Sequence, residues 1–206
     1  MLTTWRDNGH SRLLRYAALA FALYWLVLAI APVNRFDWFL ENLLVFAGAV
    51  VFVATYRKFP LSSYCYLLIL IFLALHSLGA HYTYSQTPIG NRAAEIFGHD
   101  RNHFDRLVHF SFGLLFYYPI KEFLDRYLIT GKCHWQTIIS LSFILALSSL
   151  YELLEWAAAI ILKPEDALAF LGTQGDVFDA QKDAGLAFTG GLLAVLLSRA
   201  ARLFKD

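Results

Sequence analysis

Charged residues are scarce in this chain. Asp, Glu, Lys and Arg make up 16% of its 206 residues, whereas an average soluble domain is about a quarter charged. The 17 basic residues are offset by 16 acidic ones, so the formal net charge is only +1. Proteins that bind nucleic acid need a basic face that neutralises phosphates. We therefore expect no nucleic-acid partner.

Cysteine is also nearly absent. Cys65 and Cys133 are the only two thiols, and they lack the spacing of a metal-binding motif, so we expect neither a disulfide framework nor a thiolate metal site. The sequence contains no internal repeat and no low-complexity tract. The polar connections are too short to form a second domain, so residues 1–206 are predicted to form a single transmembrane domain.

Apolar residues, by contrast, are abundant and occur in long runs. They make up 58% of the chain and form six stretches close to the 17–25 residues that a membrane-crossing helix requires. The sequence therefore predicts an all-α, polytopic bundle of six transmembrane helices. The predicted spans are residues 16–32, 38–56, 64–84, 105–120, 135–162 and 183–203.

The distribution of Lys and Arg predicts the orientation of the bundle. Eleven of these residues fall on the termini and connections of one side, and six fall on the other. Because cytoplasmic loops carry the excess of Lys and Arg, both termini are predicted to be cytoplasmic.

The first apolar stretch has a second interpretation. Arg12 and Arg15 precede a run that ends in Ala29-Ile30-Ala31, which is similar to a signal peptide with a small-residue cleavage site. The run is long, however, and Pro32 is a poor residue to follow a cut. We therefore expect a retained membrane anchor.

Polar residues inside or beside these apolar stretches gather on the predicted outer side. A charged side chain in hydrocarbon costs at least about 2.5–3.5 kcal/mol on insertion scales, so such residues usually face a bundle interior or a wet cavity. The set comprises Glu41, His76, His81, His103, Asp105, Arg106, His109, Tyr151, Glu152, Glu155, Lys163, Asp176, Asp179 and Asp183.

Within this set, acidic residues and His recur three or four positions apart, which places them on shared helix faces. Carboxylates and imidazoles that converge from several helices are the ligands of divalent-metal sites in helical bundles. The predicted metal ligands are Asp105, His109, Glu152, Glu155, Asp176, Asp179 and Asp183. Of these, Glu152, Glu155 and His109 lie within apolar sequence and are the predicted catalytic residues. The alternative is that residues at span ends are solvated, or form ion pairs that close the bundle.

Three motifs occur in order along the chain: DRLVHF at 105–110, YELLEW at 151–156 and GDVFDAQKD at 175–183. Together they resemble the bacterial inner-membrane YjdF family over nearly the whole chain. The resemblance implies a location in the bacterial inner (plasma) membrane and a six-span layout, and it implies no particular reaction. More distantly, the order of acidic residues, His and Glu is similar to VanZ-like membrane proteins, which are linked to glycopeptide resistance.

Three functions fit these observations. The first is a membrane enzyme that acts on a lipid or envelope substrate, using a divalent metal or using Glu152 or Glu155 as a general base. The second is a proton- or ion-coupled transporter, and the third is a structural or accessory membrane protein. The expected partners are membrane lipids and, for an enzyme, a lipid-linked or periplasmic small molecule.

Overall fold

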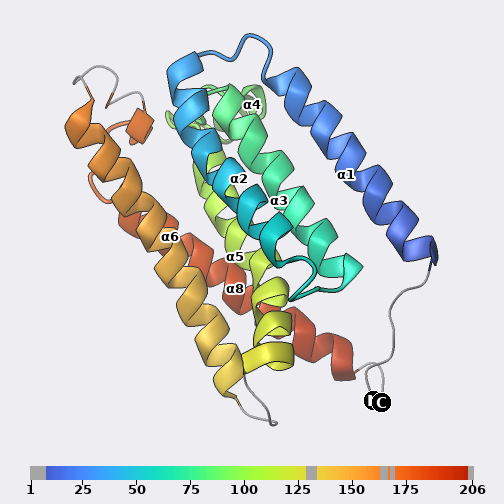
Figure 1. Cartoon of the computed structure of the whole chain (residues 1–206). Coiled ribbons are helices and arrows are strands. Elements are labelled where there is room, and N and C mark those ends of the chain that lie inside the picture. Colours follow the sequence, from blue (N-terminus) through green and yellow to red (C-terminus); the bar gives the residue numbers. More distant parts are fainter. Residues whose placement is uncertain (1–7, 129–133, 163–166, 168–169, 204–206) are drawn as a thin grey trace.

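The structure is a computed structural model, and it describes residues 8–128, 134–162, 167 and 170–203. These residues are all-helical and include no β-strand. Figure 1 shows the elements in order. They are α1 (Asn8–Leu28), α2 (Arg35–Thr55), α3 (Ser63–His81), α4 (Pro88–Phe97), α5 (Phe104–Phe123), the π-helical turn η1 (Leu124–Leu128), α6 (Trp135–Ile161) and α8 (Asp179–Leu203).

Local capping explains where several of these helices begin and end. Asn34 precedes α2, and its side-chain oxygen accepts hydrogen bonds from the backbone N–H groups of Phe36 and Asp37, as an N-cap residue does. The short helix α4, which the apolar pattern did not predict, begins with Pro88 in its first turn and ends at Gly98, whose φ is 67°. Proline at the start and a left-handed glycine after the end are typical helix boundaries.

Four helices in the described part of the chain are long and apolar enough to cross a membrane. They are α2, α3, α6 and, over Asp179–Ala200, α8. The other two long helices are α1 and α5. All six run alternately up and down the bundle, so that the start of α1 and the end of α8 lie at the same end (Figure 1). Their bounds agree with the predicted spans to within a few residues, except that α1 begins about two turns before residue 16 and α8 begins one turn before Asp183.

The centre of the bundle is the contact between α5 and α8. Here backbone meets backbone, because a Cβ atom on Gly113 would lie 1.7 Å from the carbonyl oxygen of Ala187, and one on Gly190 would lie 2.1 Å from that of Phe110. Glycine allows such close approach between membrane helices. Gly185 is different, since a Cβ atom there would meet nothing within 4 Å.

Two clusters of buried apolar side chains surround this contact. One joins Tyr117 and Ile144 to small residues of α8, and the other joins Phe72 of α3 to Phe104 and Val108 of α5. The α1 helix lies at the edge of the bundle beside α3 (Figure 1), and Leu28 is its only buried side chain among those described.

Side-chain hydrogen bonds fasten α1 near its C-terminal end. The Tyr24 hydroxyl donates to the carbonyl oxygen of Ala74 at 3.2 Å, and the indole N–H of Trp25 donates to Asn42 Oδ1 at 2.7 Å. At the other end of the bundle, Cys65 is buried and unbridged, with its sulfur 3.1 Å from a carboxylate oxygen of Glu122. Cys133 lies outside the described residues.

Candidate metal centre and its polar surroundings

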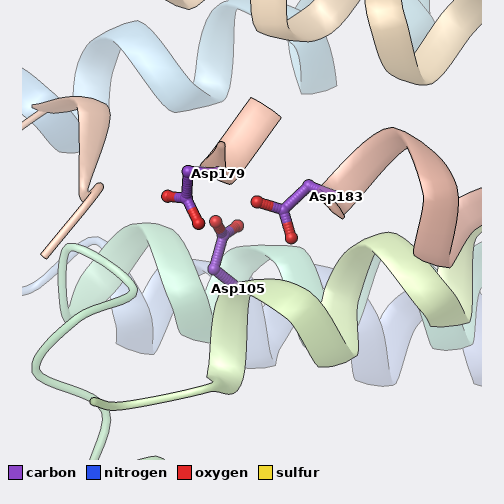
Figure 2. Close-up of side chains that lie close together, drawn as sticks. All are labelled: Asp105, Asp179 and Asp183. Atoms are coloured by element: carbon purple, nitrogen blue, oxygen red, sulfur yellow. The ribbon is translucent and has the colours of Figure 1, made fainter. Parts of the chain in front are cut away.

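Three aspartates from two helices form the candidate metal centre. Asp105 lies in the first turn of α5, and Asp179 and Asp183 lie one turn apart at the start of α8. One carboxylate oxygen of each lies within 4.8 Å of the other two. Figure 2 shows the three carboxylates directed at one another. Asp183 is only 1% exposed, and its Oδ1 has no hydrogen-bond partner among the described residues.

Two arginines pair with one of these aspartates. Arg101, in the connection before α5, places Nη2 2.6 Å from Asp179 Oδ1. Arg106 lies 3.3 Å from the same oxygen. The Arg101 and Asp179 side chains are 12% and 8% exposed, so this pair is largely removed from water.

Asp176 lies just before α8 and is fully engaged by its neighbours. Lys182 Nζ and Arg106 Nη2 each lie 2.5 Å from Asp176 Oδ2, and the backbone N–H of Phe178 donates to Oδ1. These hydrogen bonds, that of Lys182 first, hold the pKa of Asp176 well below its usual range. Asp176 is therefore an anion that fixes two cations beside the centre.

The remaining two carboxylates of the centre lack such partners. Within the described residues, no Lys or Arg nitrogen lies within 4.0 Å of a carboxylate oxygen of Asp105 or Asp183. Two buried carboxylates at this separation repel one another if both are ionised. A divalent cation would neutralise both charges, and oxygen ligands suit hard cations such as Mg²⁺ and Mn²⁺. The three aspartates could thus hold a metal ion.

A histidine and a glutamate adjoin the centre. His109, which is 7% exposed, lies one turn after Asp105 on α5, with Nε2 3.7 Å from Asp105 Oδ1 and 3.1 Å from Glu152 Oε1 of α6. Its other ring nitrogen lies 3.0 Å from the hydroxyl oxygen of Ser148. No hydrogen bond joins His109 to Glu152 in this geometry, and Oε1 of Glu152 has no hydrogen-bond partner among the described residues. When Nε2 holds the proton, the Ser148 hydroxyl donates to Nδ1. His109 and Glu152 thus lie within ion-pair distance of each other beside the three aspartates.

A second polar network ties α2 to the same end of the bundle. The Tyr151 hydroxyl of α6 donates to the carboxylate of Glu41, which is 4% exposed. His76 of α3 places Nε2 3.2 Å from the backbone oxygen of Glu41 and Nδ1 2.6 Å from the hydroxyl of Tyr84. This network links α2, α3 and α6.

Comparison with known proteins places the chain in a family. Residues 13–203 match the family described as "Predicted membrane protein (DUF2238)". The chain belongs to this family. It is also 33% identical over 184 residues to the inner membrane protein YjdF of Escherichia coli (strain K12), in an alignment that covers 89% of this chain and 88% of that protein. No solved structure matches the chain.

This membership confirms the predicted resemblance to the YjdF family and the location of the chain as a multi-pass protein of the inner membrane. It also accounts for the many exposed apolar side chains on α2 and α6, among them Val50, Val51, Leu153 and Ile160, because lipid would cover them. The more distant resemblance to VanZ-like proteins stays a prediction.

In this DUF2238 family member, the predicted site residues separate into groups. Asp105, Asp179 and Asp183 come together, and His109 and Glu152 adjoin them. The remaining predicted ligands lie outside that group. Asp176 is held in ion pairs, and Glu155 has Glu41 and Glu152 as its strongest charged neighbours.

Two further members of the predicted polar set serve other contacts. His81 bonds the backbone oxygen of Leu28 at 2.7 Å, which fastens α3 to the end of α1. His103 lies 3.3 Å from Arg106. Lys163 lies outside the described residues.

Three residues of the site were not predicted. Arg101 was counted only as a basic residue of the outer side, and Ser148 and Tyr84 had no signal in the sequence. Each contacts a residue of another segment: Arg101 pairs with Asp179, Ser148 with His109 and Tyr84 with His76. The pair of Arg101 and Asp179 has the largest separation along the sequence. Ser140 and Ser148 lie about two helical turns apart on α6, and both are buried.

Proposed function

We propose that this protein is a metal-dependent membrane enzyme that acts on a lipid or envelope substrate at the outer side of the inner membrane. The observation that carries this proposal is the unpartnered Oδ1 of Asp183, an atom of a buried carboxylate group that is directed at Asp105 and Asp179 (Figure 2). Buried polar atoms almost always have a partner. A buried carboxylate that keeps one oxygen unpaired and faces two further carboxylates is best explained by a cation that completes the group.

The residues around the three aspartates suit hydrolytic chemistry. A divalent ion bound there would lower the pKa of a bound water molecule and polarise a phosphoryl or acyl oxygen. Glu152 would accept a proton from the attacking water, and His109, oriented by Ser148, would pass a proton to the leaving group. Arg101 and Arg106, which already face Asp179, would offset negative charge that develops on the substrate.

The topology that places this centre at the periplasmic side is also a proposal. It has six spans in one domain, with α1 and α5 joining the four helices that are apolar enough to cross on their own, and both termini in the cytoplasm. It is supported by the excess of Lys and Arg on one side, eleven against six. The alternating directions of the six long helices agree with it (Figure 1).

Metal content tests the proposed function. Purified full-length protein should contain a divalent metal that a chelator removes, and the stripped protein should bind added Mn²⁺. Asp183→Asn should weaken Mn²⁺ binding by at least about 10–100-fold, the range seen when even the supports of metal ligands are removed. Asp125→Asn is the matched control, because Asp125 is 40% exposed, paired with Lys121 and located in η1 at the opposite end of α5.

The same measurements separate the alternatives. If the cluster is structural, wild type should contain no metal and Asp183→Asn should be as stable as wild type or more stable, because the substitution relieves repulsion between buried carboxylates. That pair of results would overturn the proposal. Accumulation of the bound cation inside proteoliposomes would instead identify an ion transporter.

A further inference from the structure

A large apolar cavity lies beside the candidate metal centre. Its volume is about 860 Å³, and its walls come from α1, α2, α3, α5 and α6. Most of the lining is aliphatic or aromatic. On α2 the lining residues recur every three or four positions and so form one helix face: Leu44, Val45, Gly48, Ala49, Phe52 and Val53.

One end of this cavity is formed by the site. Asp105, a member of the aspartate group, and His109, the partner of Glu152, both line it. Tyr84 and Tyr151 are further polar residues of the lining. The cavity and the candidate metal centre therefore share Asp105, and His109 adjoins both, so one end of the cavity lies beside the centre.

The length of the cavity suits the hydrocarbon chain of one lipid. Its lining on α2 extends from Leu44 to Tyr56, which corresponds to about 18 Å at a rise of about 1.5 Å per residue. Half of the hydrocarbon core of a bilayer is about 15 Å. Arg15 and Arg57 line the end of the cavity that is opposite the aspartates. Long basic side chains at such positions reach toward the membrane surface.

We propose that this cavity binds the hydrocarbon chain of the lipid substrate, with the polar group of the lipid at Asp105 and His109. The proposal rests on the proposed function, and it narrows the substrate from an envelope molecule to a lipid with one chain inserted between the helices. A chain in the cavity would exchange lipid surroundings for apolar side chains at little cost. Binding of the chain would also position the group to be cleaved beside the aspartates, since holding a substrate in the right orientation is itself a large part of catalysis.

The experiment uses full-length protein in phospholipid vesicles and two photoactivatable probes based on hexadecyl phosphate. One probe has its diazirine next to the phosphate, and the other has it at the far end of the chain. After illumination, labelled positions are read by peptide mass spectrometry. The probe labelled near the phosphate should modify the Val108–His109 segment of α5, and the probe labelled at the chain end should modify α2 near Phe52 and Tyr56.

A pair of tryptophan variants tests whether the chain occupies the cavity. A Cβ atom on Gly48 would meet nothing within 4 Å, and Gly48 lies in the middle of the lining face of α2, so Gly48→Trp should fill the cavity without a clash. Val50→Trp is the matched control on the same helix, because Val50 is 69% exposed and does not line the cavity. A chain that shares this space with the indole ring would be overpacked at a cost of about 1–3 kcal/mol, so Gly48→Trp should cut labelling of α5 by about tenfold while Val50→Trp leaves it unchanged.

Metal binding distinguishes the two proposals. Gly48→Trp should still bind Mn²⁺, which also shows that the variant folds, and Asp183→Asn should lose Mn²⁺ but keep the labelling pattern. Labelling in a wild-type protein that binds no metal would refute only the metal centre. Equal labelling of α5 in the two tryptophan variants would overturn the lipid site. A reversed pattern, with the phosphate end near Arg57, would also overturn it.

Discussion

The backbone contact between α5 and α8 makes one prediction quantitative. Gly113→Ala places a Cβ atom 1.7 Å from the carbonyl oxygen of Ala187, whereas ordinary van der Waals contact begins at 3.4 Å. No side-chain rotation relieves this clash, because the opposing atom belongs to the backbone. The two helices must therefore separate locally by about the difference, which is about 1.7 Å. Overpacking of this kind costs about 1–3 kcal/mol, partly offset by the preference of about 0.5–1 kcal/mol for Ala over Gly in a helix.

The same separation reaches the candidate metal centre. Asp105 belongs to α5, whereas Asp179 and Asp183 belong to α8, so a shift between the helices changes the distances between the ligands. Metal sites tolerate deviations of only about 0.2 Å. We expect Gly113→Ala to lower the free energy of unfolding by about 1–2 kcal/mol and to weaken Mn²⁺ binding by about 10–100-fold.

Thermal unfolding in detergent and Mn²⁺ titration measure the two effects. Gly185→Ala is the matched control, since Gly185 lies on the same helix as Ala187 and a Cβ atom there meets nothing within 4 Å. The control should be as stable as wild type or more stable by about 0.5–1 kcal/mol, with unchanged metal binding. If the two alanine variants behave alike, the contact between α5 and α8 does not set the geometry of the centre.

Three further predictions concern charge and topology. The pKa of Asp176 is depressed in the folded protein, so the contribution of this residue to stability is present above its unfolded pKa of about 3.9 and is lost as the pH falls below that value. The difference in Tm between wild type and Asp176→Asn should therefore be larger at neutral pH than near pH 3 (about one unit below that pKa). An unchanged difference would contradict this. Arg101→Met breaks a largely buried pair with Asp179. Breaking such a pair costs about 3–5 kcal/mol of stability, and the remaining contact between Arg106 and Asp179 reduces this loss. Added Mn²⁺ should restore part of the lost thermal stability, and no recovery would argue against a cation at the three aspartates. Lys and Arg are in excess on one side of the bundle, which predicts that this side is cytoplasmic. Reporter fusions after Asp7, within 121–134 and after Asp206 should therefore report the cytoplasm, and fusions within 85–103 and 164–174 should report the periplasm. A periplasmic C-terminus would reverse the proposed orientation.

Local spacing was enough to predict several parts of the site. Asp105 and His109 are four residues apart, and the helix does bring them within 3.7 Å of each other. Asp179 and Asp183 share a helix turn for the same reason. Asp176 does not continue that face, because the chain turns at Gly175, whose φ is 84°, and α8 begins only at Asp179.

Long-range pairing could not be predicted in the same way. The pattern of one helix shows which face is polar, but it does not show which residue of another segment will meet that face. Arg101 therefore had no assigned partner, although it pairs with Asp179 at 2.6 Å. The same limit applies to the glycines, since only the fold shows that Gly113 meets Ala187 and that Gly185 faces open space.

The way α1 is fastened bears on how a molecule could reach the interior. Of the described residues in α1, those bonded to other helices through side chains are Tyr24, Trp25 and Leu28, all in its last two turns. Residues from Leu14 to Phe21 line the cavity and have no side-chain hydrogen bond to α2 or α3 within the described part of the chain. Within the described residues, α1 is thus hydrogen-bonded to the rest of the bundle at its C-terminal end only. In a bilayer, where lipid replaces apolar contacts at little free-energy cost, we expect the N-terminal half of α1 to separate from the bundle more readily than its C-terminal half.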